Sequence, residues 1–153
     1  MTSFNEVRVF RTHPAAKLPQ RAHSTDAGMD LFYCPSEAIS LTIPPGRGTL
    51  LQTGVKIQVP PNCMLQIMNK SGIASKRQLF TGACVVDEGY TGEIFVNLHN
   101  VGVESQTILP GQKIAQGVFV RIEKPDLVPV EHDEIYDAPT TRGSGALGST
   151  GDK

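Results

Sequence analysis

Glycine and proline interrupt this chain so often that long helices have little room to form. The 153 residues include 15 glycines and 11 prolines, and the longest stretch free of both runs from Met1 to His13. The next such stretch, residues 62–71, is ten residues long. A mean helix needs about 11–12 residues, and glycine or proline in its interior costs roughly 1 or 3 kcal/mol. The distribution of these residues therefore excludes a fold built from helices.

Between these interruptions, the hydrophobic pattern has the period of two that is typical of strands with one wet face. It is clean in residues 39–43 and 55–59 and weaker in residues 64–68, 93–98 and 115–122. Turn residues such as Pro-Pro-Gly and Pro-Pro-Asn separate the segments. Short strands at this spacing predict an all-β sandwich, jelly roll or barrel.

One short helix is predicted at residues 73–78, directly after a Ser-Gly pair. We find no internal repeat, and the length suits one domain.

Charge and composition exclude several classes of protein. Fourteen basic and fifteen acidic residues give a net charge of −1, whereas a protein that binds nucleic-acid backbone usually carries a basic excess. No run approaches the roughly 18 apolar residues of a membrane span. The first ten residues lack the apolar core of a signal peptide, and three cysteines without a Cys-x-x-Cys pair fit a reducing compartment. We therefore expect an intracellular protein in the cytoplasm, or also in the nucleus if the source is eukaryotic or viral.

The C-terminal residues contain a literal G-x-G-x-x-G at positions 143–148. A dinucleotide-binding loop needs a helix after it, but only five residues follow Gly148, and Ser149 stands where a P-loop has lysine. Both named motifs are rejected. Backbone amides and the side chains of Arg142 and Thr150 nevertheless suit phosphate oxygens. The segment is either a disordered tail or a flexible arm that closes over a bound polyphosphate.

Three internal segments are more polar than a core requires. Residues 26–31 place two aspartates around a glycine, and residues 69–74 place a lysine and a serine ahead of the predicted helix, a natural anion site. Residues 82–92 form a predicted strand, tight turn and strand, with acids and a tyrosine at the bend. Each segment also has a plainer interpretation, as a turn, a solvated surface charge and an ordinary hairpin.

In this order, these segments resemble the motifs of the trimeric deoxyuridine triphosphate nucleotidohydrolase (dUTPase) family. The five matching motifs are residues 27–31, 70–74, 82–100, 111–116 and 142–151. The resemblance implies a distorted β jelly roll, or β-clip barrel, in a homotrimer whose sites are shared between subunits. It also implies hydrolysis of dUTP to dUMP and pyrophosphate with Mg2+, which keeps uracil out of DNA and supplies dUMP for thymidylate synthesis.

The resemblance further implies a role for individual residues. Asp87 would be the general base that orients a water toward the α-phosphorus, Tyr90 would pack under the deoxyribose, and Asp30 would support Mg2+ through water. Residues 1–138 would form the catalytic jelly roll and residues 139–153 the flexible arm. The remaining predicted substrate-binding residues are Cys84, Val85, Val86, Phe95 and Leu147 at the base, Lys70, Ser71, Gly72, Gln116, Arg142, Ser149 and Thr150 at the phosphates, and Gly82 and Gly148, which have no assigned part of the substrate.

Four positions depart from the family pattern. Lys70 replaces an arginine, Gly89 a second acid, Ala146 a glycine and Leu147 a phenylalanine that stacks on uracil. Because base stacking on an aromatic ring is worth about 1–3 kcal/mol, we expect weaker substrate binding or looser arm closure than in a typical member.

Two functions other than dUTP hydrolysis fit parts of this sequence. A dCTP deaminase of the same fold would carry a catalytic glutamate where this chain has Asn97, which cannot shuttle a proton. The second alternative is a diverged jelly roll that binds a nucleotide or a partner without catalysis.

Overall fold

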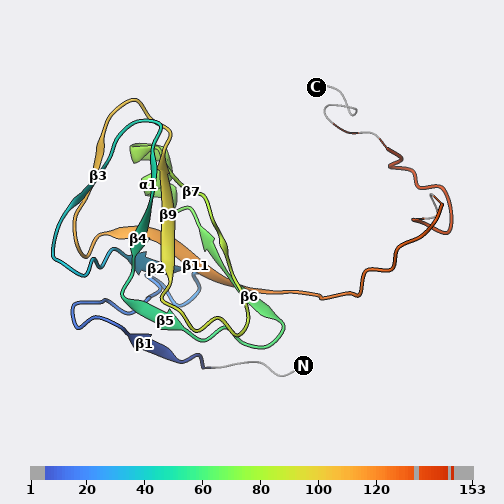
Figure 1. Ribbon diagram of the computed structural model, residues 1–153, viewed down its shortest axis with the longest axis horizontal. Coiled ribbons are helices and arrows are strands. Elements are labelled where there is room, and N and C mark those ends of the chain that lie inside the picture. The colour runs from blue at the N-terminus through green and yellow to red at the C-terminus, as the bar shows by residue number, and fades with distance from the viewer. Residues whose placement is uncertain (1–5, 133–134, 145, 147–153) are drawn as a thin grey trace. The chain divides into compact units, whose positions relative to one another are not determined.

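The computed structural model describes residues 6–132, 135–144 and 146. The chain divides into two compact units, Met1–Glu123 and Lys124–Lys153. All helices and strands of the described residues belong to the first unit (Figure 1). The predicted boundary after residue 138 stays a prediction, and no placement of one unit against the other is described.

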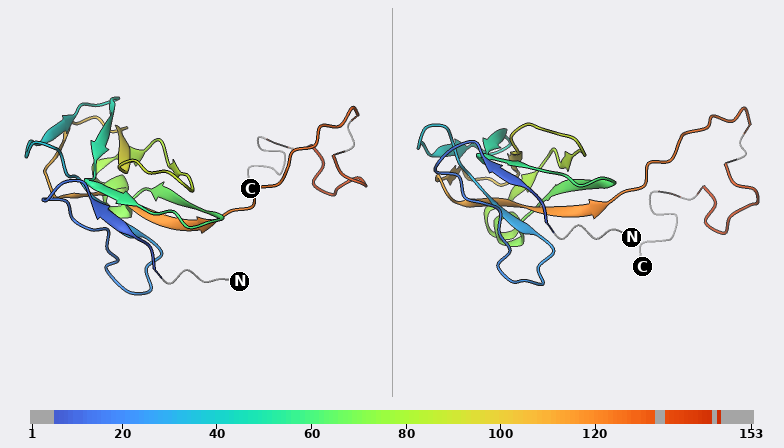
Figure 2. Two further views of the ribbon diagram at one scale, coloured as in Figure 1. Left: turned by 60° about the horizontal axis from the view of Figure 1, so that its bottom comes forward. Right: turned by 90° about the horizontal axis from the view of Figure 1, so that it is seen from below.

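The first unit is built from strands with a single short helix, as predicted (Figures 1 and 2). The elements in order are β1 (Val9–Arg11), β2 (Met29–Phe32), β3 (Leu41–Ile43), β4 (Gly48–Gln52), β5 (Val55–Ile57), β6 (Cys63–Met68), α1 (Ser71–Arg77), β7 (Leu79–Thr81), β8 (Val85–Val86), β9 (Phe95–Asn100), β10 (Gln106–Ile108) and β11 (Lys113–Arg121).

The strands pair in four antiparallel sheets. Their orders are β1-β5, β10-β3, β2-β11-β6-β8 and β4-β9-β7. The all-β prediction is therefore confirmed, although among the described residues the strands do not close into one continuous barrel.

The hydrophobic core lies between these sheets because alternate strand residues point inward. In β5, Val55 and Ile57 are buried and Lys56 between them is exposed. In β9, Val96 and Leu98 are buried, with Asn97 half-buried between them. The largest fully buried apolar side chains are Leu31, Ile43, Leu51, Leu65, Leu79, Ile94, Leu98, Ile108 and Ile114.

Strand β11 places polar residues of neighbouring strands side by side. It lies between β2 and β6, so Gln116 is opposite Asp30 on one side and opposite Met68 on the other. Directly after β6, Lys70 takes the N-cap position of α1. Three residues that the resemblance assigns to phosphate and metal binding therefore lie on β2, on β11 and directly after β6, which are neighbours in one sheet.

Candidate active site

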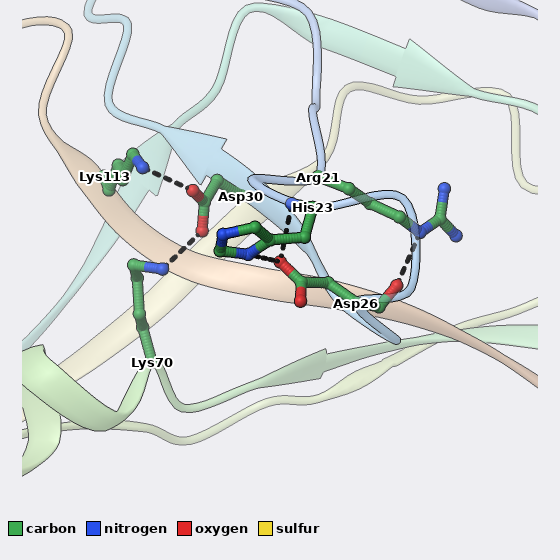
Figure 3. A network of polar contacts seen from close by, with 6 residues as sticks. All are labelled: Arg21, His23, Asp26, Asp30, Lys70 and Lys113. Carbon is green, nitrogen blue, oxygen red and sulfur yellow. Dashed lines mark hydrogen bonds and ion pairs between the residues drawn. The ribbon is translucent and has the colours of Figure 1, made fainter.

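Asp30 is a buried carboxylate held between two lysines. The residue is 4% exposed, and its Oδ1 accepts a hydrogen bond from Lys70 Nζ at 2.6 Å. Its Oδ2 lies 2.7 Å from Lys113 Nζ in a second ion pair. Figure 3 shows the two ammonium groups reaching the carboxylate from different sides. The two cations and one anion leave a local excess of one positive charge.

The environment of Asp30 favours its ionised form. Burial by itself raises the pKa of the carboxyl, but the hydrogen bonds and charges of Lys113 and Lys70 outweigh that effect. The pKa of Asp30 is therefore held below its ordinary value. At neutral pH, the carboxylate fixes both lysines at the end of the sheet.

Gln116 lies beside this cluster, in space that is free because position 28 is a glycine. Its Nε2 donates to the Asn69 carbonyl at 2.9 Å. A Cβ at position 28 would collide with Gln116 Oε1 and would lie 2.7 Å from Gln116 Cδ. Glycine at position 28 therefore makes room for the Gln116 amide.

The first turn of α1 adds exposed polar groups next to Lys70. Ser71 and Gly72 are both exposed, and the Ser71 carbonyl accepts a hydrogen bond from Ser75 Oγ at 2.7 Å. The Lys70 side chain is 31% exposed. These groups form, with Gln116, a polar edge that is open to an anionic ligand.

Asp87 lies in the tight turn that follows β8. The Tyr90 amide donates to the Asp87 carbonyl at 3.2 Å, and Gly89 has a φ of +82°, a conformation that favours glycine. The Asn62 amide donates to Glu88 Oε2 at 3.0 Å, which ties the turn to the start of β6. The Asp87 side chain is exposed, so its carboxylate is accessible to water and ligand.

A pocket of about 300 Å3 opens beside this turn. Tyr90 belongs to its wall, and the Tyr90 hydroxyl donates to the Glu93 carbonyl at 3.0 Å, which fixes the ring. The wall is mainly apolar and carries a small number of polar groups, as ligand pockets usually do. Its residues are Leu50, Ala83, Val85, Val86, Asp87, Tyr90, Glu93, Ile94, Phe95 and Asn97.

The other predicted base-binding residues lie at the strand side of the hairpin. The Cys84 carbonyl accepts from the Ile67 amide at 2.7 Å, so this oxygen already has a partner in β6. The Gly82 amide donates to the Asn97 carbonyl at 2.8 Å. Val85 and Val86 pair with β6 and line the pocket.

The predicted residues thus form two groups within one chain. Among the described residues, no hydrogen bond or ion pair connects Asp30, Lys70 or Gln116 with Asp87 or Tyr90. The pocket wall includes none of the first three residues.

The remaining predicted residues belong to the second unit. Arg142 is described there and is exposed. Leu147, Gly148, Ser149 and Thr150 lie outside the described residues. Their predicted contacts with the substrate therefore stay predictions.

The described residues do not gather metal-ligating side chains in one place. They contain no group of three or more His, Cys, Asp or Glu side chains that could hold a metal ion. Asp30 does not fit a metal ligand as it stands, because both of its oxygens already contact lysines.

None of the described helices has the length and apolar character needed to cross a membrane.

Sequence reasoning missed three residues of this region. Lys113 was not assigned to Asp30, because only the pairing of β11 with β2 brings the two together. Gly28 was seen only as part of a motif and not as the space for Gln116. Asn97 was noted only for its inability to shuttle a proton, whereas it lines the pocket.

A hairpin pocket with an exposed carboxylate, together with a cation-rich edge, has the chemistry of a site for a ligand with a ring and an anionic part. Comparison with known proteins gives the family. The family model for dUTPase matches residues 15–151, nearly the whole chain. The chain therefore belongs to the dUTPase family.

Curated relatives and solved structures agree with this assignment. A deoxyuridine 5'-triphosphate nucleotidohydrolase of Gloeothece citriformis is 43% identical over 148 residues, which cover 95% of this chain and 97% of the relative. The enzyme of that name from Mus musculus is 38% identical over 145 residues, covering 95% and 85%.

A dUTPase of Staphylococcus bacteriophage 80alpha, solved with dUpNHpp, matches with a TM-score of 0.85 and 26% identity over 97% of this chain and 99% of that one. A dUTPase variant of S. aureus phage phi11, described with a structural Mg(II) ion, matches with a TM-score of 0.76 and 26% identity over 85% and 99%. The likeness to these structures confirms the jelly-roll prediction.

Proposed function

We propose that this protein hydrolyses dUTP to dUMP and pyrophosphate, with Asp87 as the general base. The observation that carries the proposal is the position of Asp87, exposed on the wall of a ring-sized pocket that also contains Tyr90. A carboxylate that can reach both water and a bound ligand can orient the water and accept its proton. Family membership supports the substrate, because the curated relatives are named for this reaction.

The pocket supplies the binding surface for the nucleoside. The fixed Tyr90 ring offers a flat apolar face for the deoxyribose, and the exposed edge of β8 faces the space where the base would lie. The hairpin joins this pocket directly to Asp87, so a bound nucleoside would place its α-phosphate near that carboxylate.

The cation-rich edge supplies the phosphate contacts. Lys70 and Lys113 are held by Asp30, and both ammonium groups remain partly exposed, with side chains 31% and 41% accessible. A fixed positive charge stabilises the negative charge that develops on the leaving pyrophosphate. Gln116, Ser71 and Gly72 add polar groups at the same edge.

We further propose that the complete site forms between copies of the chain in a homotrimer. The two groups share no hydrogen bond, ion pair or pocket wall among the described residues of one chain, which suits a site completed by a neighbouring copy, since one site needs both the base Asp87 and the cations around Lys70. The arm, with Arg142, Ser149 and Thr150, would then add donors for the terminal phosphate and Leu147 would cover uracil.

Mg2+ is proposed to enter with the triphosphate, whose charge it would partly neutralise. Mg2+ keeps several waters and needs few protein ligands, so the lack of a cluster of ligands among the described residues does not oppose it. The water-mediated role of Asp30 stays a prediction, as does the cytoplasmic location.

The test is pyrophosphate release from each deoxynucleoside triphosphate by the full chain with Mg2+. We expect release from dUTP, and a loss of about 100-fold or more in Asp87→Asn, with dUpNHpp binding retained. Full activity of this variant would refute the role of Asp87. Ammonia release from dCTP would instead favour the deaminase alternative, which no present finding supports.

Sharing of the site is tested by mixing two inactive variants. Asp87→Asn and Lys70→Met each remove one of the two groups, so a trimer assembled from both chains can contain a site with neither change. Recovery of activity after co-refolding supports the shared site. Failure to recover activity, with mixed trimers verified by native mass spectrometry, would contradict it.

A further inference from the structure

Asn97, in the wall of the pocket, forms hydrogen bonds with two neighbouring segments of the chain. Its Nδ2 donates to the Thr49 carbonyl at 3.2 Å, and its Oδ1 accepts from the Ala83 amide at 3.3 Å. Its backbone carbonyl accepts from the Gly82 amide at 2.8 Å. One residue of β9 therefore ties together β4 and the segment that leads into β8.

His99 fixes the orientation of the Asn97 amide. The two residues lie on the same face of β9, and His99 Nε2 is 2.7 Å from Asn97 Oδ1. The bonds to Thr49 and Ala83 identify which amide atom is the oxygen, because a carbonyl needs a donor and an N–H needs an acceptor. Since Oδ1 only accepts, His99 Nε2 carries the proton that bridges the pair.

Two glycines make room for this pair. A Cβ at position 48 would lie 2.5 Å from the His99 ring, and a Cβ at position 82 would lie 2.6 Å from His99 Nε2 and would collide with Asn97 Oδ1. Gly48 is opposite His99 in the register of β4 and β9. The space around the imidazole is therefore built into the backbone on both sides.

We propose that Asn97, oriented by His99, is a positioning residue that sets base discrimination by fixing the backbone of Gly82 and Ala83 beside the pocket. This inference rests on the proposed function. Uracil and cytosine differ in the donor and acceptor pattern of one edge, so backbone groups distinguish them only if they stay in place. The Asn97–His99 pair holds Gly82 and Ala83, which directly precede Cys84 to Val86, the residues whose backbone the resemblance assigns to the base.

The experiment compares Asn97→Val with His99→Phe and His99→Gln in the full chain. We expect Asn97→Val to raise KM for dUTP about ten-fold and to lower the dUTP-over-dCTP ratio of kcat/KM by about the same factor, the effect of one or two net hydrogen bonds. The kcat should change by less than about three-fold, because binding and not the water-activating carboxylate is altered. His99→Phe should shift the ratio in the same direction, and His99→Gln, which keeps a donor, should restore it.

Thr42→Val is the matched control, because it removes the exposed hydrogen bond between Thr42 and Thr107 at 2.9 Å in a different sheet. It should leave KM and the ratio unchanged. An active wild type with unchanged KM and ratio in both Asn97→Val and His99→Phe would overturn the inference.

Two measurements keep the test independent of turnover. Nitrogen NMR of the wild type should show neutral His99 as the Nε2–H tautomer, and Asn97→Val should speed hydrogen exchange at the Ala83 amide. The Nδ1–H tautomer, or unchanged exchange, would overturn the inference. A wild type inactive on dUTP would instead refute the proposed function.

Discussion

Replacing Asp30 with asparagine tests the ion cluster that its buried carboxylate forms with Lys70 and Lys113. Asparagine keeps the shape of the side chain, so no cavity forms, but the negative charge between Lys70 and Lys113 is lost. Removing one partner of a fully buried ion pair costs about 3–5 kcal/mol. Here both ammonium groups are partly exposed and can turn toward water, so we expect Asp30→Asn to lower the free energy of unfolding by about 1–3 kcal/mol.

The stabilisation that Asp30 contributes depends on pH, because only the ionised carboxylate attracts the two lysines. The native pKa of Asp30 is lowered, so its stabilising contribution is complete above the unfolded pKa of about 3.9 and disappears as the pH falls through the native pKa. The difference between wild type and Asp30→Asn should therefore be largest at neutral pH and should shrink below about pH 4.

Urea unfolding at one protein concentration, repeated from neutral to acidic pH, measures this difference, because other carboxylates titrate equally in both proteins. Asp126→Asn, at an exposed position after β11, is the control and should change stability by less than about 0.5 kcal/mol. A difference that stays constant down to about pH 3, or one no larger than that of the control, would refute the account of the cluster.

Three further substitutions probe the binding edge, the arm and the core. Gly28→Ala should displace the Gln116 amide from the Asn69 carbonyl and raise KM for dUTP about five- to ten-fold. The urea midpoint should stay almost unchanged. An unchanged KM would contradict the placement of Gln116. Leu147→Phe should lower KM by restoring an aromatic ring over uracil, and an unchanged or higher KM would count against this role. Leu98→Ala, at a side chain 1% exposed, should cost about 2–5 kcal/mol in chemical denaturation, and a loss below about 1 kcal/mol would be inconsistent with its burial.

The sequence predicted the strands that have one buried and one solvent-exposed face, because apolar and polar residues alternate along them. Residues 39–43 and 55–59 alternate in this way and overlap β3 and β5. Strand β2 was missed because three of its four residues are buried, including the ion-paired Asp30, so the pattern has no period of two. The helix was predicted at 73–78 and begins two residues earlier, because glycine in the first turn was taken as a preceding break.

The local part of the site was easier to predict than the part made by distant segments. Asp87 and Tyr90 belong to one tight turn, so a single motif of the family resemblance contains both residues. Lys113 and Asp30 meet only because β11 pairs with β2, and nothing in the separate segments specifies that register. The Asn97–His99 pair was missed because alternate residues of a strand usually contact neighbouring strands and not each other.

The central claim is that water attacks the α-phosphorus of dUTP at a site built around Asp87. Hydrolysis in 18O-labelled water, followed by mass spectrometry of both products, tests it most directly. We predict one 18O atom in dUMP and none in pyrophosphate. Label in the pyrophosphate, or release of inorganic phosphate in place of pyrophosphate, would contradict the account.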